Sequence, residues 1–191
     1  INNNGYISTS ELYKAVVAKL PRLMSNNDFI TTDYGLRNLL KYYLKYIYSF
    51  EGVISAKGES LKVYDVFANY CRNNAAFTLK DLYALAGELN TNIYFDAVYA
   101  NSIRIDKDSF VSIQSLHFDI SAVDAAIGSF CTSEYITISD IPLFLSFPEV
   151  GYTWNKFLLE SYVFHFSKQF KLIHDRFNAT VAIGAIVKSS N

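Results

Sequence analysis

Hydrophobic positions recur at helical spacing along much of the chain and alternate with polar positions in a few short segments. The clearest helical pattern covers residues 78–89, where apolar residues recur every three or four positions until the turn residues 90–92 interrupt them. Residues 93–100 form a second, shorter helical pattern. Residues 102–106 and 109–113 then alternate apolar with polar side chains around a two-residue turn, which predicts a β-hairpin.

A Thr near an acidic residue marks three predicted helix starts. The Thr hydroxyl accepts hydrogen bonds from free N–H groups of a first turn, and a carboxylate complements the positive end of the helix dipole. The starts are Thr32 with Asp33, Thr78 with Asp81, and Thr137 with Asp140. A helical pattern precedes each of them, over residues 10–20, 61–72 and 121–131. The chain therefore shows a weak threefold repeat.

The order helix, helix, tight turn, helix and hairpin in residues 61–119 resembles a winged-helix module, which is a helix-turn-helix followed by a two-stranded wing. This resemblance, at the level of a superfamily, implies a mainly α chain with small β-hairpins. We therefore expect an α+β fold of tandem winged-helix-like units packed together. The expected units are residues 1–60, 61–119 and 120–191.

The first and third expected units, residues 1–60 and 120–191, show the winged-helix order of elements less completely than the middle unit. In residues 1–60, the pattern predicts one continuous helix over residues 34–50 and a brief wing over residues 52–58. In residues 120–191, the predicted elements are a second helix over 137–148, a third helix over 153–166, and wing strands over 170–174 and 180–187 around a loop at 175–179.

Composition narrows the class of protein. Hydrophobic residues make up 51% of the 191 residues and charged residues 18%, where about 25% is usual, so the chain is expected to fold. The longest stretch without a charged residue, 177–187, is far shorter than the roughly 20 residues of a membrane-spanning helix. Two cysteines are too few for a disulfide framework, which favours a cytoplasmic location. The chain begins with Ile1 and a polar stretch, as expected of a piece of a longer polypeptide.

The sequence offers no set of residues for catalysis, a cofactor or a metal. Phosphate-binding glycine loops, HExxH, CxxC and GxSxG motifs are all missing from it. Its three histidines, His117, His165 and His174, have no nearby cysteine or carboxylate cluster that would complete a zinc site. Cys71 and Cys131 take corresponding places in two repeats, which favours packing over nucleophilic chemistry. We therefore expect a protein that is not an enzyme.

Basic residues gather on the predicted helix 34–50. Arg37, Lys41 and Lys45 recur every fourth position and share one face, which Asn38 and Tyr42 flank. Cations neutralise phosphates, Asn can pair with adenine, and Tyr can stack on a base. These five residues are the predicted nucleic-acid-binding site, for DNA or RNA, and the alternative is an ordinary solvated helix face. The opposite side is apolar and expected to be buried: Leu36, Leu39, Leu40, Tyr43 and Ile47.

Charge is distributed unevenly along the near-neutral chain. Residues 1–60 hold seven cations and five anions, a net charge of +2, whereas residues 61–119 carry −2 and residues 120–191 carry −1. The helix at 93–100 has no cation and contains Asp96, so it is expected to be core or a protein interface. Arg104 and Lys107 of the following hairpin are offset by Asp106 and Asp108. Nucleic acid is therefore expected to bind the first unit.

Aromatic residues concentrate around residues 152–166. Such density is typical of a core, and on a surface it marks a partner site, so Tyr152, Trp154 and Tyr162 are the predicted protein-interface residues. The function predicted first is a non-enzymatic, regulatory DNA-binding module of tandem winged-helix-like units. The alternative is an interaction or scaffold module that contacts another protein or the remainder of the parent chain.

Overall fold

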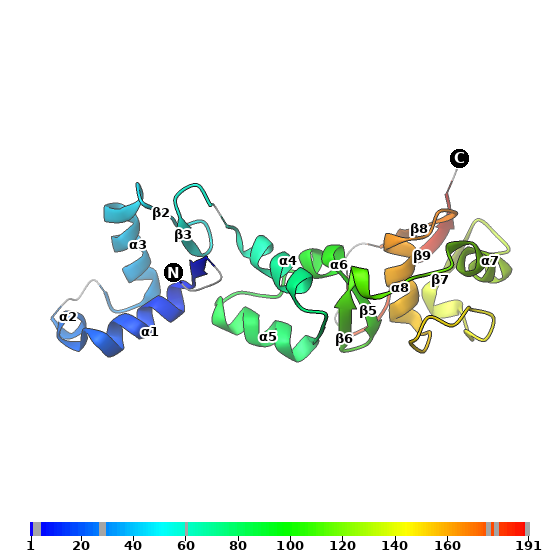
Figure 1. The fold of residues 1–191 in the computed structure, drawn as a ribbon, viewed down its shortest axis with the longest axis horizontal. Helices are drawn as coiled ribbons and strands as arrows, with labels where there is room; N and C mark the ends of the chain where they lie inside the picture. Colours follow the sequence, from blue (N-terminus) through cyan, green and yellow to red (C-terminus); the bar gives the residue numbers. More distant parts are fainter. Residues whose placement is uncertain (2–4, 27–29, 60, 175–176, 178–179, 190–191) are drawn as a thin grey trace. The chain divides into compact units, whose positions relative to one another are not determined.

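The computed structural model of the chain is a mixed α+β structure, and it describes residues 1, 5–26, 30–59, 61–174, 177 and 180–189 (Figure 1). The elements, in chain order, are β1 (Tyr6–Ile7), α1 (Thr9–Lys19), α2 (Pro21–Ser25), α3 (Asp33–Leu44), β2 (Tyr48–Ser49), β3 (Ile54–Ala56), α4 (Val63–Asn73), β4 (Ala76–Thr78), α5 (Leu79–Glu88), α6 (Phe95–Asn101), β5 (Ser102–Asp106), β6 (Ser109–Ser112), the 3-10 helix η1 (Ile113–Ser115), α7 (Ile120–Phe130), β7 (Tyr135–Thr137), the 3-10 helix η2 (Ile138–Asp140), α8 (Lys156–His165), β8 (Phe170–Ile173) and β9 (Ala185–Lys188).

The described strands form three small antiparallel sheets with the same topology. Their strand orders are β1-β3-β2, β4-β6-β5 and β7-β9-β8. In each sheet the first strand lies at one edge, one or more helices follow it, and a final hairpin supplies the other two strands. The last strand in sequence is therefore always the central one. Phe77 of β4, for example, lies opposite Phe110 of β6, and their rings stack with centroids 5.4 Å apart.

A hydroxyl residue ends or directly follows each first strand, just before the next helical segment. Ser8 Oγ accepts a hydrogen bond from the backbone N–H of Glu11 at 3.1 Å and caps α1. Thr78 Oγ1 accepts from the N–H of Asp81 at 3.3 Å, while the Asp81 carboxylate accepts from the Thr78 N–H at 2.8 Å. Thr137 Oγ1 donates to the carboxylate three residues further on, at 2.7 Å. The repeated feature is thus a short strand followed by a hydroxyl residue and a helical turn, and the hydroxyl caps the helix in the first two sheets but not at η2.

The helices around the first sheet, α1 and α3, occupy different positions in the repeat from those predicted from the sequence. The sequence predicted that the helix over residues 10–20 corresponds to the helices over 61–72 and 121–131, each of which precedes a helix start marked by Thr. In the structure α1 instead follows the first strand of its sheet, β1, and therefore corresponds to α5, which follows β4. Thr32 caps α3, because its Oγ1 accepts from the Gly35 N–H at 3.1 Å. The helix α3 directly precedes the hairpin β2–β3, as α6 and α8 precede theirs.

Two predicted helices are shorter than expected. The helix predicted over residues 34–50 ends at Leu44, and Tyr48–Ser49 pairs with β3 instead. The helix predicted over residues 137–148 is a single 3-10 turn, η2. Pro142 explains this difference, since a residue before proline is driven out of the helical region, and Ile141 is extended at φ −78° and ψ 107°. The loop predicted at residues 175–179 lies, apart from residue 177, outside the described residues.

The contacts divide the chain into two compact units. The first consists of Ile1–Phe67 and Leu82–Tyr94, and the second of Ala68–Asp81 and Phe95–Asn191. The second unit has a large aromatic and aliphatic core, to which α7, α8 and the hairpins contribute. Among the helices of the described part, none is both long and apolar enough to cross a membrane.

Candidate nucleic-acid interface

The helix α3 forms at its place because its ends are specified locally. Thr32 caps it, and Asp33 adds a carboxylate in the first turn, where it complements the helix dipole. The helix packs beside α1 and the strand β2, and Leu36 is its one buried residue among those described. It is therefore held from one side and presents most of its surface to solvent.

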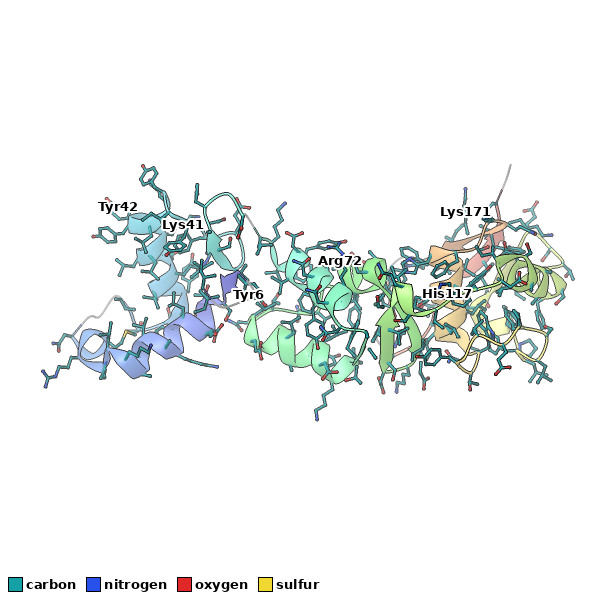
Figure 2. All side chains as sticks on the ribbon, viewed as in Figure 1. Tyr6, Lys41, Tyr42, Arg72, His117 and Lys171 are labelled. Carbon is teal, nitrogen blue, oxygen red and sulfur yellow. The ribbon has the colours of Figure 1, made fainter. Side chains whose placement is uncertain are left out.

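The five predicted nucleic-acid-binding residues fall into two groups. Asn38, Lys41, Tyr42 and Lys45 are exposed, with 73% of the Tyr42 side chain accessible. Figure 2 shows Lys41 and Tyr42 projecting from the α3 ribbon. Arg37 is half-buried, and its guanidinium donates a hydrogen bond to the backbone carbonyl of Phe50. Arg37 therefore ties α3 to the turn between β2 and β3, while the other four residues make a polar surface.

The side of α3 predicted to be buried is largely exposed. Leu36 is buried and Leu40 is half-buried, as expected, but 38% of Leu39, 68% of Tyr43 and 58% of Ile47 are accessible. The physical reason is the thin packing of this region, since α1, the neighbouring helix, has no buried residue of its own. An apolar pattern predicts which face can be buried, but not whether another element covers it.

Tyrosines continue the exposed surface beyond the basic residues. Tyr46, in the turn after α3, has 80% of its side chain accessible, and Lys45 Nζ lies 5.2 Å from its ring centroid. The Tyr42 and Tyr43 rings meet edge to face with centroids 5.1 Å apart. Sequence reasoning did not include Tyr43 and Tyr46 in the site. The signal was nonetheless present, because residues 34–50 contain three cations, no carboxylate and a dense run of tyrosines.

The helices that precede the other two hairpins are far more buried than α3. Ala97, Val98 and Tyr99 of α6 are buried, and its exposed residues are Asp96 and Ala100. In α8, six consecutive residues are buried: Leu158, Leu159, Glu160, Ser161, Tyr162 and Val163. Among the described residues of these helices and their C-caps, α3 with its C-cap Lys45 presents two exposed lysines, whereas α8 exposes Lys156 and α6 has no cation.

The predicted protein-interface residues lie in different environments. Tyr162 has no accessible surface and donates from its hydroxyl to Asp124 Oδ1 at 2.9 Å. Trp154 is 8% accessible, and its indole N–H donates to the carbonyl of Pro148 at 2.6 Å. Both residues belong to the core of this unit, where the Trp154 ring packs on Phe147 and the Tyr162 ring on Phe118. Tyr152 is 41% accessible and is the one of the three that can meet a partner directly.

A buried cation, Arg104, occupies the interior of the second unit. From the sequence it was counted as a surface cation of the wing, but the structure gives its side chain no accessible surface. Its guanidinium carbon lies 4.0 Å from the Phe157 ring centroid, and the group donates hydrogen bonds to the Lys107 carbonyl and the Tyr99 hydroxyl. The aromatic faces and acceptors compensate for the lost hydration of this charge.

A buried carboxyl, Glu160, lies in the same unit. Its Oε1 accepts from the backbone N–H of Ile183 at 3.3 Å, and its Oε2 has no hydrogen-bond partner among the described atoms. Burial raises the pKa of Glu160 to about 7, although the positive charge of Arg104 opposes that shift. Sequence reasoning missed both charged groups. For Glu160 a signal existed, since Glu160-Ser161 interrupts an otherwise apolar stretch of the helix.

His165 and the two cysteines are buried or half-buried within the packing of the chain. His165 Nε2 donates to the Tyr99 carbonyl at 2.7 Å, and burial lowers the pKa of His165. Cys71 and Cys131 are both free and buried, and burial raises the pKa of Cys71 to about 12, which opposes thiolate formation. Within the described residues, no group of three His, Cys, Asp or Glu side chains is placed to hold a metal ion.

Comparisons of this chain with protein-family models, with curated proteins and with solved structures gave no match.

Proposed function

We propose that the chain is a series of winged-helix-like units and that it binds nucleic acid through α3 in a regulatory, non-catalytic role. The winged-helix part of the proposal is supported by the order of elements in the middle segment, which is α4, β4, α5, α6, β5 and β6. This order is the one expected of a helix-turn-helix, α5 and α6, with a strand before it and a two-stranded wing after it. The strand order that the three sheets share supports proposing a similar arrangement for the other two segments.

The observation that carries the binding proposal is the exposure of α3 at the place before its hairpin. In a helix-turn-helix, the last helix is the one that enters the major groove. Here α6 and α8, at the corresponding places, have their middle residues buried. In α3, Asn38 and Lys41 are exposed, and so is the C-cap residue Lys45. The basic residues and the exposed helix therefore coincide. The proposed roles are phosphate neutralisation by the two lysines and contact with base edges by Asn38.

Fluorescence anisotropy with a labelled 20-base-pair duplex at about 50 mM salt tests this proposal. We expect binding at micromolar protein or below, with an affinity that falls steeply as salt rises. Replacing Lys41 and Lys45 together by Ala removes two phosphate contacts. The slope of log affinity against log salt should then become shallower by about 2, at roughly 0.9 per phosphate.

The matched control removes two exposed lysines from another part of the chain. Lys168 and Lys171 are both exposed, and the double variant K168A/K171A changes the net charge equally. We expect its affinity and salt dependence to stay close to those of the unmodified chain. The proposal fails if no duplex binds at 50 mM salt, or if both double variants weaken binding to the same extent.

A second candidate function, contact with a protein partner, has one favourable observation. An open surface cavity of about 540 Å³ is lined by residues that include Leu143, Leu145, Tyr152 and Trp154. Leu145 is 90% accessible and Leu143 58% accessible, although both are apolar. If this surface is used for association, the L143S/L145S variant should bind less of an environment-sensitive hydrophobic dye. It should also shift the sedimentation of the chain toward that of a monomer. Unchanged dye binding and sedimentation would argue against it.

A cytoplasmic location is part of the proposal and is supported by the two free, buried cysteines.

A further inference from the structure

We infer that the surface at the C-terminal end of α3 binds unpaired bases of single-stranded nucleic acid by stacking. This inference rests on the proposed function and specifies the ligand of the same region. The surface consists of three tyrosines, Tyr42, Tyr43 and Tyr46, beside two lysines, Lys41 and Lys45, and is called the tyrosine surface below.

The first observation that supports stacking is the exposure of the three tyrosine rings. Between 68% and 80% of each of the three tyrosine side chains is accessible, so most of each ring is available for contact. Aromatic side chains of this size are usually buried at least in part, because each removes 150–250 Å² of surface from water when covered. Three such rings within five residues are an unusual concentration of uncovered aromatic surface.

In the tyrosine surface, each of the two lysines is followed directly in the chain by a tyrosine. Lys41 and Tyr42 are consecutive exposed residues of α3. Lys45, the C-cap residue of α3, and Tyr46, in the turn that follows, form a second such pair, and the Lys45 ammonium is 5.2 Å from the Tyr46 ring centroid. The Tyr46 ring therefore has a cation next to it, and Tyr42 and Tyr43 lie between the two lysines in the chain. A nucleotide has matching groups, a flat base and a phosphate.

Charge favours nucleic acid over protein as the occupant. Residues 34–50 carry three cations and no carboxylate, so the surface has a single sign of charge. Lysine is depleted from the centres of protein interfaces, whereas single-strand-binding proteins combine cations along the backbone with aromatic platforms for the bases. The tyrosine surface follows the second pattern.

Exposed tyrosine rings can stack on unpaired bases of a nucleic acid. In a duplex both faces of each base are already covered by neighbouring base pairs, and only base edges and backbone are accessible. A side chain can stack only on a base that has left that arrangement. The lysines can contact the phosphates of single strands and of duplex alike. A preference for single strands would therefore come from the tyrosines.

The experiment compares fluorescein-labelled (dT)20, (U)20 and a blunt 20-base-pair duplex by anisotropy. The variants are Y43A/Y46A, the ring-preserving Y43F/Y46F, and Y83A, which removes a tyrosine of similar exposure (57%) on α5. We expect Y43A/Y46A to weaken binding of a single strand at least about tenfold, since each stacked base contributes roughly five- to 150-fold. The duplex affinity should change less than about twofold. Y43F/Y46F and Y83A should bind all three probes as the unmodified chain does.

The outcomes separate this inference from the proposed function. Loss of duplex and single-strand binding at 50 mM salt in the unmodified chain would overturn both. Binding that depends on Lys41 and Lys45 but is equal for single strand and duplex, and insensitive to Y43A/Y46A, would overturn stacking alone. A stronger response of (dT)20 or of (U)20 to Y43A/Y46A supports stacking and shows which of the two strands the tyrosines contact better. All three tyrosines are exposed, so circular dichroism should show the variants folded.

Discussion

Replacing the buried Glu160 by Gln should stabilise the second unit at neutral and alkaline pH and leave it unchanged in acid. The pKa of this carboxyl is raised from its ordinary 4.5 to about 7, because burial removes its hydration. Below pH 4.5 the group is protonated in the folded and the unfolded chain alike. As pH rises from 4.5 to 7, the unfolded chain ionises first, so the folded state progressively loses stability relative to it.

The size of the effect follows from the shift. Each pKa unit corresponds to about 1.4 kcal/mol, so the shift costs the folded chain about 3 kcal/mol above pH 7. Glutamine stays neutral and keeps an oxygen that can accept from the Ile183 N–H. The stability difference between E160Q and the unmodified chain should therefore rise from near zero at pH 4.5 to about 3 kcal/mol at pH 8. The Arg104 charge is already included in the shifted pKa.

The chain contains a suitable reporter for the assay. Its single tryptophan, Trp154, lies in the core of the same unit, so urea unfolding followed by tryptophan fluorescence reports on this unit. The lowered pKa of His165 produces the opposite trend, since its contribution to stability is present above pH 6.5 and lost in acid. That trend is common to both proteins and cancels in the difference. Glu134→Gln, an exposed site, is the matched control. A difference that stays constant between pH 4.5 and 8, or an E160Q protein less stable at pH 8, would refute the reasoning.

Three further substitutions test individual contacts. Asp124 is buried and accepts four hydrogen bonds, two from backbone N–H groups just before β8, so Asp124→Asn should lower the free energy of unfolding by about 2 kcal/mol in urea titrations. Arg104→Lys should lower it by about 2 kcal/mol, because lysine cannot keep both the contact with the Phe157 ring and the fork of hydrogen bonds; an unchanged urea midpoint would contradict this. Thr32→Ala removes the α3 cap and should lower thermal stability by about 1 kcal/mol, measured by the helical circular dichroism signal, with Thr32→Ser as the variant that retains it.

Local patterns predicted the middle of the chain well. The bounds of α4, α5 and the hairpin β5–β6 agree with the sequence prediction within two residues at each end. Each of these elements is specified by its own residues, either by apolar spacing and caps or by alternation around a tight turn. The mixed α+β class followed from the same patterns and is confirmed, whereas the winged-helix identity of the units stays a prediction.

The predictions that failed depended on contacts between distant residues. Tyr48 and Ser49 belong to a strand because Ala56 and Ser55 pair with them, and a helical pattern can run through such residues undetected. Arg104 is buried because α8 lies against β5 and places Phe157 over the guanidinium, at a separation of more than fifty residues. The Ser8 cap was missed for another reason, since the first repeat uses Ser and Glu where the others use Thr and Asp.

The central place of the last strand in each sheet has a consequence for how the chain is synthesised. β7 and β8 each pair with β9 and not with each other, so the third sheet has no ladder until residues 185–188 have been made. A nascent chain that stops short of β9 would hold two unpaired edge strands, which are prone to pair with other chains. Completion of each sheet thus waits for its final residues to leave the ribosome, and truncation before Ala185 should produce aggregation during expression.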